Sequence, residues 1–297
     1  MSLKQYIYDT ADRTLPPGEL RLEFPVVKDA NDADIFVWPG SLSQFKSRED
    51  LYGLPQMRGR EHRHVFLGLG EDTTTYDMPC MFLRPNLTQD MLEHDENSIS
   101  IPWPVEDFGS CARPQNNAFD YDVSFHGWLS RRRRGRTGTT REIAVNSCRD
   151  EGLKTDFHVY PTFYGHQSLD EQLKRRRLYL DSLQQSKLAL CPESIPGNIP
   201  YRFYEAMSAG RVPVLVGSNY VLPFADVIDW TCVYEVALDR APYTGGLVSA
   251  YLAVFRGQNL IDEGRRCRSV WARYLCPAVW PYAFALAIER KLAKVAA

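Results

Sequence analysis

Long apolar runs are missing from this sequence. The N-terminal stretch "MSLKQYIYDTADR" is polar, and the C-terminal stretch "CPAVWPYAFALAIERKLAKVAA" is only briefly apolar before it turns basic. A helix that crosses a bilayer needs about 20 apolar residues. We therefore expect no signal peptide and no membrane span, and we interpret the C-terminal stretch as a docking helix. An anchor removed from a longer chain is the alternative.

Paired cysteine motifs are missing as well. The seven cysteines are odd in number and scattered, with no C-x-x-C pair and no histidine at metal-ligand spacing from them. This pattern favours a reducing compartment over a disulfide scaffold and predicts no zinc site.

A strong charge of one sign is the third feature that the chain lacks. Lys and Arg number 35 and Asp and Glu 37, which gives a net charge of −2. The overall charge therefore requires no polyanionic partner. The exception is "RRRRGR", Arg131 to Arg136, which is either a solvated loop or a patch for an anionic acceptor.

Short apolar runs alternate with polar or helical stretches along most of the 297 residues. Runs such as "ADIFVWPG", "HVFLGLGED" and "CMFLRP" are typical of buried strands in a parallel sheet that is covered on both faces. A second series begins at "DVSFHGW" and alternates strand and helix for about a hundred residues, which indicates βαβ units. The predicted class is α/β.

The alternation weakens at residues 110–122, "SCARPQNNAFDYD", where we place a linker. We therefore predict two Rossmann-like domains, over residues 1–115 and 116–275. A C-terminal helix over residues 276–297 follows, and it could pack back on the first domain.

One short helix pattern, "GNIPYRFYEAMSAG", carries two charges on a common face. Asn198 is predicted to be its N-cap, Pro200 lies in the first turn and Gly210 ends it. The helix follows the strand "SKLALCPE" and so begins at the carboxyl end of a parallel strand, where α/β sheets bind ligands. Arg202 is then placed for a phosphate and Glu205 for ribose hydroxyls. The alternative is an exposed i,i+3 ion pair.

The segment from Ser186 to Trp230 resembles the signature of exostosin-like glycosyltransferases, glycosyltransferase family 47. The resemblance rests on an Arg-x-x-Glu-Ala helix, a Val-Pro-Val strand, a Leu-Pro-Phe segment and a terminal Asp-Trp. These parts are Arg202, Glu205, Ala206, residues 212–214, residues 222–224, Asp229 and Trp230. Weaker matches are "YDVSFHGWLSRRRRGRTGTTRE" and "RGREHRHVF", the latter with Glu61 where the family usually has Asp.

This resemblance implies a GT-B fold, in which two Rossmann-like domains face a cleft. The C-terminal domain would bind a UDP-sugar and the N-terminal domain the acceptor, a glycan or glycoconjugate. Such enzymes usually invert the anomeric centre without a metal or other cofactor, and family precedents for the sugar are xylose, galactose and glucuronic acid. The sequence agrees on the metal, because it has no Asp-x-Asp in a strand-end position.

Several residues are candidates for donor binding beside Arg202 and Glu205. Arg141 begins a helix after "TGTT", and arginines of the basic run could also reach the diphosphate. Tyr160, followed by Pro161, could support the base, with ordinary packing as the alternative. The remaining candidates lie at a strand end or in the loop before the Arg202 helix: His126, Gly127, Ser194 and Asn198.

An inverting transfer needs a general base, which we expect from the N-terminal domain. Asp72 is the first choice and Glu71 the second, because they follow the apolar strand "HVFLGLG". His64 and His62 are alternatives, although His64 could be a structural residue. His94, Asp95 and Glu96 are interpreted as a polar surface turn; Asp229 could be a cap and Trp230 a packing residue.

Two other functions compete with glycosyl transfer. A non-catalytic nucleotide- or sugar-binding protein could retain the same fold, and release of UDP in the presence of an acceptor separates the two. Nucleic-acid binding is disfavoured by the net charge. We expect a cytoplasmic enzyme of bacterial or viral type, with a truncated Golgi form as the alternative. The oligomeric state cannot be read from the sequence.

Overall fold

The computed structural model of the protein describes residues 3–8, 24–40, 42–68, 74–109, 119–129, 139–162, 167–256 and 258–296. The chain divides into two compact units. The first comprises Met1–Pro102, Asn219–Ile228 and Pro277–Ala297, and the second comprises Trp103–Ser218 and Asp229–Cys276. The chain thus leaves the first unit at Pro102, ahead of the predicted linker, and its C-terminal segment belongs to the first unit.

The first unit is built on a sheet of five parallel strands in chain order, β1-β2-β3-β4-β5. The strands are β1 (Gln5–Ile7), β2 (Ile35–Trp38), β3 (His64–Leu67), β4 (Met81–Arg84) and β5 (Ile99–Ser100). Its helices are α1 (Arg48–Tyr52), α2 (Gln89–His94) and α8 (Trp280–Ala296). Phe36, Phe66 and Phe82 come from three neighbouring strands and form the centre of an aromatic core.

Helix α8 packs within this unit through ring and polar contacts, among them the following three. The rings of Phe284 and Phe224 are 5.7 Å apart. Lys291 donates to the Glu96 carbonyl at 2.7 Å, and Arg290 donates to the Asp226 carbonyl at 3.3 Å. Across the described ranges, no helix is both long enough and apolar enough to cross a bilayer.

The second unit holds another parallel sheet of five strands, in the order β10-β9-β8-β6-β7. The strands are β6 (Tyr121–Trp128), β7 (Thr155–Tyr160), β8 (Ser186–Pro192), β9 (Val212–Gly217) and β10 (Tyr234–Ala237). Numbered from the first strand of this unit, the order is 5-4-3-1-2, which is the doubly wound arrangement. The order in which the chain adds strands to the sheet reverses between β6 and β8, while the strands themselves stay parallel.

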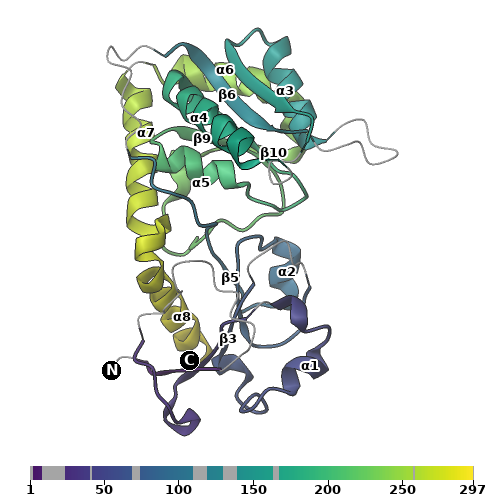
Figure 1. Ribbon diagram of the computed structural model, residues 1–297, viewed down its shortest axis with the longest axis vertical. Helices are drawn as coiled ribbons and strands as arrows, with labels where there is room; N and C mark the ends of the chain where they lie inside the picture. The colour runs from purple at the N-terminus through teal and green to yellow at the C-terminus, as the bar shows by residue number, and fades with distance from the viewer. Residues whose placement is uncertain are drawn as a thin grey trace. The chain divides into compact units, whose positions relative to one another are not determined.

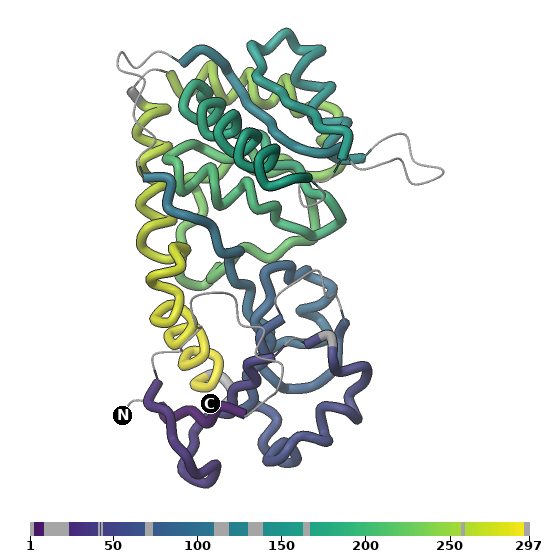
Figure 2. Tube along the Cα trace, in the orientation of Figure 1, coloured from purple at the N-terminus to yellow at the C-terminus, as the bar shows by residue number. Residues whose placement is uncertain are grey.

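The strands are connected by α3 (Thr140–Asp150), α4 (Leu169–Gln185) and α5 (Tyr201–Ser208). The last strand, β10, is followed by α6 (Thr244–Val254) and α7 (Gln258–Val270). Helix α3 packs against α6, while α4 and α5 lie on the other face of the sheet (Figure 1). Figure 2 traces the chain from α4 through β8 into α5.

Short 3-10 and π-helical segments complete the described structure. They are the 3-10 turns Ala30–Asp32, Leu42–Gln44, Glu61–Arg63, Trp230–Cys232, Leu238–Tyr243 and Pro277–Val279, and the π turn Trp271–Leu275. Asp229 caps one of them by accepting the Thr231 N–H at 3.0 Å. The prediction of an α/β protein with two parallel sheets is confirmed.

Of the two predicted ends of the Arg202 helix, the C-terminal one is correct and the N-terminal one is wrong. Helix α5 begins at Tyr201 with Pro200 as its N-cap, so the assignment of the N-cap to Asn198 is wrong. Gly210 follows the helix with a φ of 69°, its N–H donates to the Met207 carbonyl, and the Arg211 N–H donates to the Ala206 carbonyl. These two bonds form a Schellman motif, in which the left-handed residue is a glycine because it has no Cβ.

His64, a candidate base in the sequence, is a core residue of the first unit. Its side chain is fully buried and stacks on Phe36 at 4.8 Å. Nδ1 donates to the Arg60 carbonyl at 2.9 Å, and Nε2 lies 2.9 Å from the Tyr8 hydroxyl. Burial is the main cause that lowers the pKa of His64 from 6.5 to about 4. Such an imidazole stabilises the fold in its neutral form.

The pH dependence of stability follows from this burial. Between about pH 6.5 and 4, the unfolded chain protonates His64 and the folded chain does not. The free energy of unfolding should therefore fall by roughly 3 kcal/mol as the pH drops through this window. Urea unfolding measured from pH 7 to pH 4 should show a smaller pH slope for His64→Gln. The exposed control His94→Gln should keep the wild-type slope; equal slopes for His64→Gln and wild type would contradict the assignment.

Candidate functional site

The reversal of strand order between β6 and β8 defines the candidate site. In a doubly wound sheet, the loops after the two strands at the reversal leave in opposite directions, and ligands bind between them. Arg141 of α3 lies at this place, because it donates to the Trp128 carbonyl at 3.0 Å and to the Pro192 carbonyl at 3.4 Å. It thereby connects the carboxyl ends of β6 and β8.

Arg202 lies in the first turn of α5, beside aromatic rings. The carbon of its guanidinium is 5.9 Å from the centre of the Phe125 ring and 5.7 Å from that of Tyr179. Its Nε is buried and has no hydrogen-bond partner among the described residues, and the buried Tyr179 hydroxyl likewise has none there. Buried donors are nearly always satisfied in folded proteins, so these groups are available to hydrogen-bond a ligand or water.

Gly127 supports this arrangement sterically. A Cβ at Gly127 would lie 2.7 Å from a carbon of the Phe125 ring. Glycine at this position therefore leaves room for the ring that packs near Arg202.

His126 and Tyr160 lie on neighbouring strands and contact each other. The Tyr160 hydroxyl is 3.3 Å from Nδ1 of His126, and the Arg175 guanidinium covers the Tyr160 ring at 4.2 Å. His126 is only 1% exposed, and burial, followed by the nearby His158, lowers its pKa to about 3. A side chain this buried supports the strand end and has little surface for a donor molecule.

The loop between β8 and α5 contains a residue that the sequence interpretation missed, Glu193. Its Oε2 accepts the backbone N–H groups of Gly197 at 3.1 Å and Ser218 at 3.2 Å. Its Oε1 accepts the Thr140 hydroxyl at 3.4 Å. One buried carboxylate thus holds together the loop before α5, the end of β9 and the start of α3.

The predicted loop residues Ser194 and Asn198 lie close to Glu193 in the sequence. Ser194 follows Glu193 directly and is partly exposed, while Asn198 is buried and its backbone N–H donates to the Ile195 carbonyl at 3.1 Å. A Cβ at Gly217 would lie 2.7 Å from Oε2 of Glu193, which explains the glycine that ends β9. A carboxylate ahead of a Pro-Gly-Asn loop was the sequence signal that could have identified Glu193.

Glu205 does not pair with Arg202. Its buried carboxylate pairs instead with Arg176 of α4, and Arg176 also pairs with Glu106 at 3.1 Å. The Arg176 guanidinium lies 4.4 Å from the centre of the Phe108 ring. The alternative of an exposed Arg202–Glu205 ion pair is therefore wrong, and the cation of Arg202 is left for another partner.

The first-choice bases, Asp72 and Glu71, lie outside the described residues, as do Arg131 to Arg136. His62 lies in a 3-10 turn and is partly exposed. Their roles stay predictions.

Asp95 is not part of a surface turn, as the sequence interpretation had it. It is fully buried, pairs with the buried Arg84 at 3.2 Å, and accepts the backbone N–H groups of Tyr76 and Asp77. Burial raises the pKa of Asp95 against the opposing effect of Arg84. The neighbouring His94 and Glu96 are exposed. Asp95 is a structural residue of the first unit.

Comparison with known proteins identifies relatives of this chain. The family model described as the exostosin GT47 domain matches residues 20–234. A probable glycosyltransferase of Arabidopsis thaliana is 43% identical over 58 residues, and human Exostosin-like 1 is 49% identical over 41 residues. These matches cover 20% and 14% of this chain, but only 11% and 6% of the relatives' own length.

Solved structures agree on the fold. The crystal structure of a glycosyltransferase from Rickettsia africae superposes with a TM-score of 0.53 and 8% identity, covering 88% of this chain and 78% of the other. The fold is of the GT-B type, with a parallel sheet in each unit. Since the family model matches more than half of the residues, the chain belongs to the exostosin GT47 family.

Proposed function

We propose that the protein is an inverting, metal-independent glycosyltransferase that moves a sugar from a UDP-sugar to a hydroxyl of a glycan or glycoconjugate. The observation that carries the proposal is Arg202, a cation at the strand-order reversal. Its Nε is buried, and no carboxylate of the described chain pairs with it. Family membership supports the reaction class.

Arg202 suits the leaving group of this reaction. When the bond between the anomeric carbon and the diphosphate breaks, negative charge develops on the UDP oxygens. A guanidinium can donate two hydrogen bonds to such oxygens, and the free N–H groups at the start of α5 can add to them. Arg141 lies at the same strand ends, so a second cation is close to the proposed diphosphate.

Glu205 is proposed to accept hydrogen bonds from the ribose hydroxyls. Its pairing with Arg176 fixes the carboxylate in one place, because Arg176 is itself anchored by Glu106 and Phe108. A carboxylate held in this way needs no rearrangement to receive the sugar. Ser194, Asn198 and Tyr160 are proposed to complete the donor site, with His126 and Gly127 shaping the end of β6 beneath it.

Metal independence is supported by where the acidic pairs lie. The sequence contains Asp32-Ala33-Asp34 and Asp120-Tyr121-Asp122. The first pair precedes β2 and the second lies at the start of β6. Both are therefore at the amino ends of strands, away from the edge that binds ligands. Positive charge for the leaving group would come from Arg202 instead.

The general base is proposed to be Asp72, with Glu71 as the second candidate. Either would remove the proton from the acceptor hydroxyl as that oxygen attacks the anomeric carbon. Both follow β3, so they come after the carboxyl end of a strand in the sheet of the first unit. Xylose, galactose and glucuronic acid stay the proposed donor sugars.

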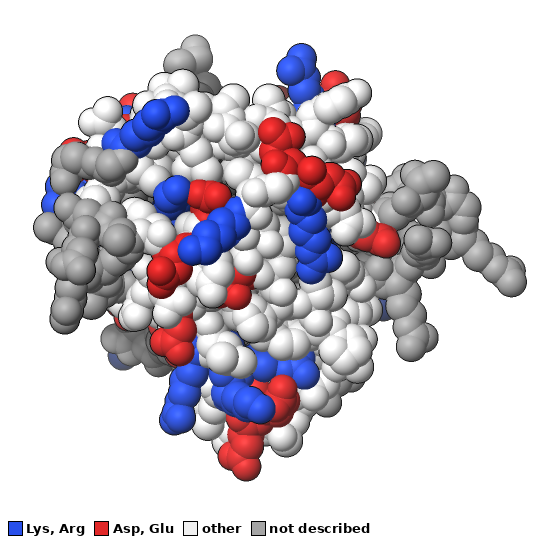
Figure 3. Space-filling model, turned by 90° about the horizontal axis from the view of Figure 1, so that it is seen from above, with Lys and Arg blue, Asp and Glu red and all other residues white. Residues whose placement is uncertain are grey.

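Two alternatives remain distinguishable by experiment. A non-catalytic nucleotide-binding protein would bind UDP but would not release it from a UDP-sugar when an acceptor is present. A nucleic-acid-binding protein would need a basic surface. On the face shown in Figure 3, Lys and Arg alternate with Asp and Glu, which disfavours this function for that face.

Replacing Arg202 tests the donor site. Arg202→Ala should weaken UDP binding roughly 100-fold, because a charge-assisted bidentate contact is lost. Isothermal titration calorimetry measures this change. Arg265→Ala, which removes an exposed arginine of α7 in the same unit, should bind UDP as the wild type does. Wild-type affinity in Arg202→Ala would place the diphosphate elsewhere.

Replacing Asp72 tests the base. Asp72→Asn should lower the transfer rate by about 10²- to 10⁴-fold while UDP binding is kept, since the amide cannot accept the proton. A coupled assay for UDP release reports the rate. The exposed Glu93→Gln is the matched acid-to-amide control in the first unit. Transfer at the wild-type rate in Asp72→Asn would move the role of base to Glu71 or to another residue.

A further inference from the structure

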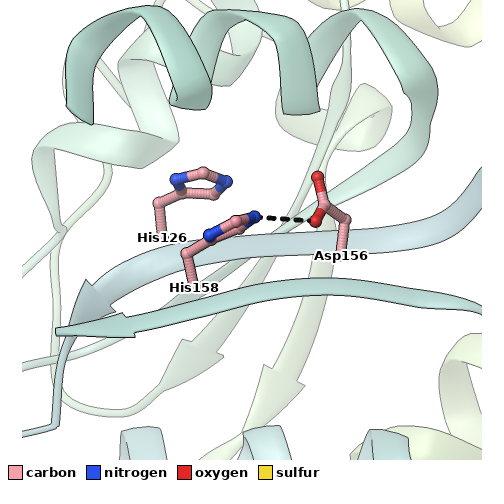
Figure 4. Close-up of side chains that lie close together, drawn as sticks. All are labelled: His126, Asp156 and His158. Carbon is pink, nitrogen blue, oxygen red and sulfur yellow. Dashed lines mark hydrogen bonds and ion pairs between the residues drawn. The ribbon is translucent and has the colours of Figure 1, made fainter. Parts of the chain in front are cut away.

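Three potential metal ligands lie together on one face of the second sheet. His126 of β6 is paired in register with His158 of β7, and Asp156 lies two residues before His158 on the same face. One ligand atom from each residue lies within 4.8 Å of the other two. Figure 4 shows the two imidazole rings over each other and the Asp156 carboxylate beside His158.

One buried ring nitrogen in this cluster has no hydrogen-bond partner among the described residues. This atom is Nε2 of His126, whose side chain is 99% buried. A buried polar atom without a partner is rare and indicates a missing ligand or water. The other nitrogen of the ring, Nδ1, is near the Tyr160 hydroxyl. The free nitrogen is therefore the one available to a ligand.

We propose that His126, His158 and Asp156 bind a zinc-class divalent cation. Imidazole nitrogens and a carboxylate oxygen are the donor set that Zn²⁺ accepts, and a water would complete a tetrahedral site. The site goes beyond the proposed function, because the proposed sugar transfer uses no metal ion. Its expected role is to hold the edge strand β7 against β6.

For His158 and Asp156, the geometry is close to what tetrahedral coordination requires. Two ligand atoms at Zn–N and Zn–O distances of about 2.0–2.1 Å lie about 3.3 Å apart. In the structure, Nε2 of His158 is 2.9 Å from Oδ1 of Asp156, where the two share a hydrogen bond. Zinc would take the place of the proton in that bond, and His158 would stay neutral by carrying its proton on Nδ1. These two groups need to separate by only a few tenths of an ångström. The ring of His126 is stacked on that of His158, with centroids 4.3 Å apart and 29° between the planes, and it has to turn for its nitrogen to reach the same ion.

The surroundings both support and oppose a cation. The Tyr160 hydroxyl near Nδ1 of His126 provides the outer contact that orients a metal-bound imidazole. His126 is held neutral by burial, and neutral imidazole is the form that binds metals. Arg202 opposes a cation, since its positive charge also contributes to the low pKa of His126. The Asp156 carboxylate offsets this charge.

Zinc titration of the full chain tests the site. After treatment with a chelator and its removal, the protein should bind one equivalent of Zn²⁺ in competition with a chromophoric zinc indicator, and the melting temperature should rise. His158→Ala and Asp156→Asn should each weaken binding by at least about 100-fold, because each loses a direct ligand. Both side chains are partly exposed, so these variants should fold.

Control variants separate this site from adventitious binding. His94→Ala and Cys276→Ser, which remove other accessible metal ligands, should bind zinc like the wild type. Arg202→Ala, which is expected to impair UDP binding, should bind zinc at least as tightly as the wild type, so failure of the donor site would not mimic failure of the metal site. No saturable binding by the wild type, or unchanged binding by His158→Ala, would overturn the proposal.

Discussion

The strand-order reversal between β6 and β8 is the constraint that organises the second unit. It directs α3 to one face of the sheet and α4 and α5 to the other, so that the loops after β6 and β8 leave in opposite directions. Arg141 connects the two strand ends through their carbonyls, and Arg202 enters the same region from α5. The strand order thus places two cations at the edge where doubly wound sheets bind ligands.

Buried carboxylates hold the elements around this edge. Glu193 joins three segments through Gly197, Ser218 and Thr140, and burial raises its pKa, so that the hydrogen bonds must offset the cost of a buried charge. Glu205 is fixed by Arg176 in a similar way. With Glu193 and Glu205 held by other partners, Arg202 has no carboxylate partner among the described residues. Its positive charge is therefore available to an anion.

The sequence was sufficient for features that depend on local pattern. Alternation of apolar runs identified the two parallel sheets, and Arg202, Glu205 and Gly210 were placed correctly on or after one helix. The N-cap was misplaced because Pro200 lies between Asn198 and the helix start and keeps an extended backbone there.

Features that depend on contacts distant in sequence could not be predicted. Asp95 pairs with Arg84 of another element, and its buried position is not visible in the polar string "LEHDENS". The cluster of His126, Asp156 and His158 depends on the register between β6 and β7, which fixes which residues face each other. Glu193 likewise contacts residues on separate elements. In each case, a polar side chain finds its partner only through the fold.

A crystal structure of the protein with UDP would test the central claim most directly. The account predicts that the diphosphate lies at the carboxyl ends of β6 and β8, with phosphate oxygens within hydrogen-bonding distance of the Arg202 guanidinium and the ribose near Glu205. UDP bound away from this edge, with Arg202 making no contact to it, would contradict the account.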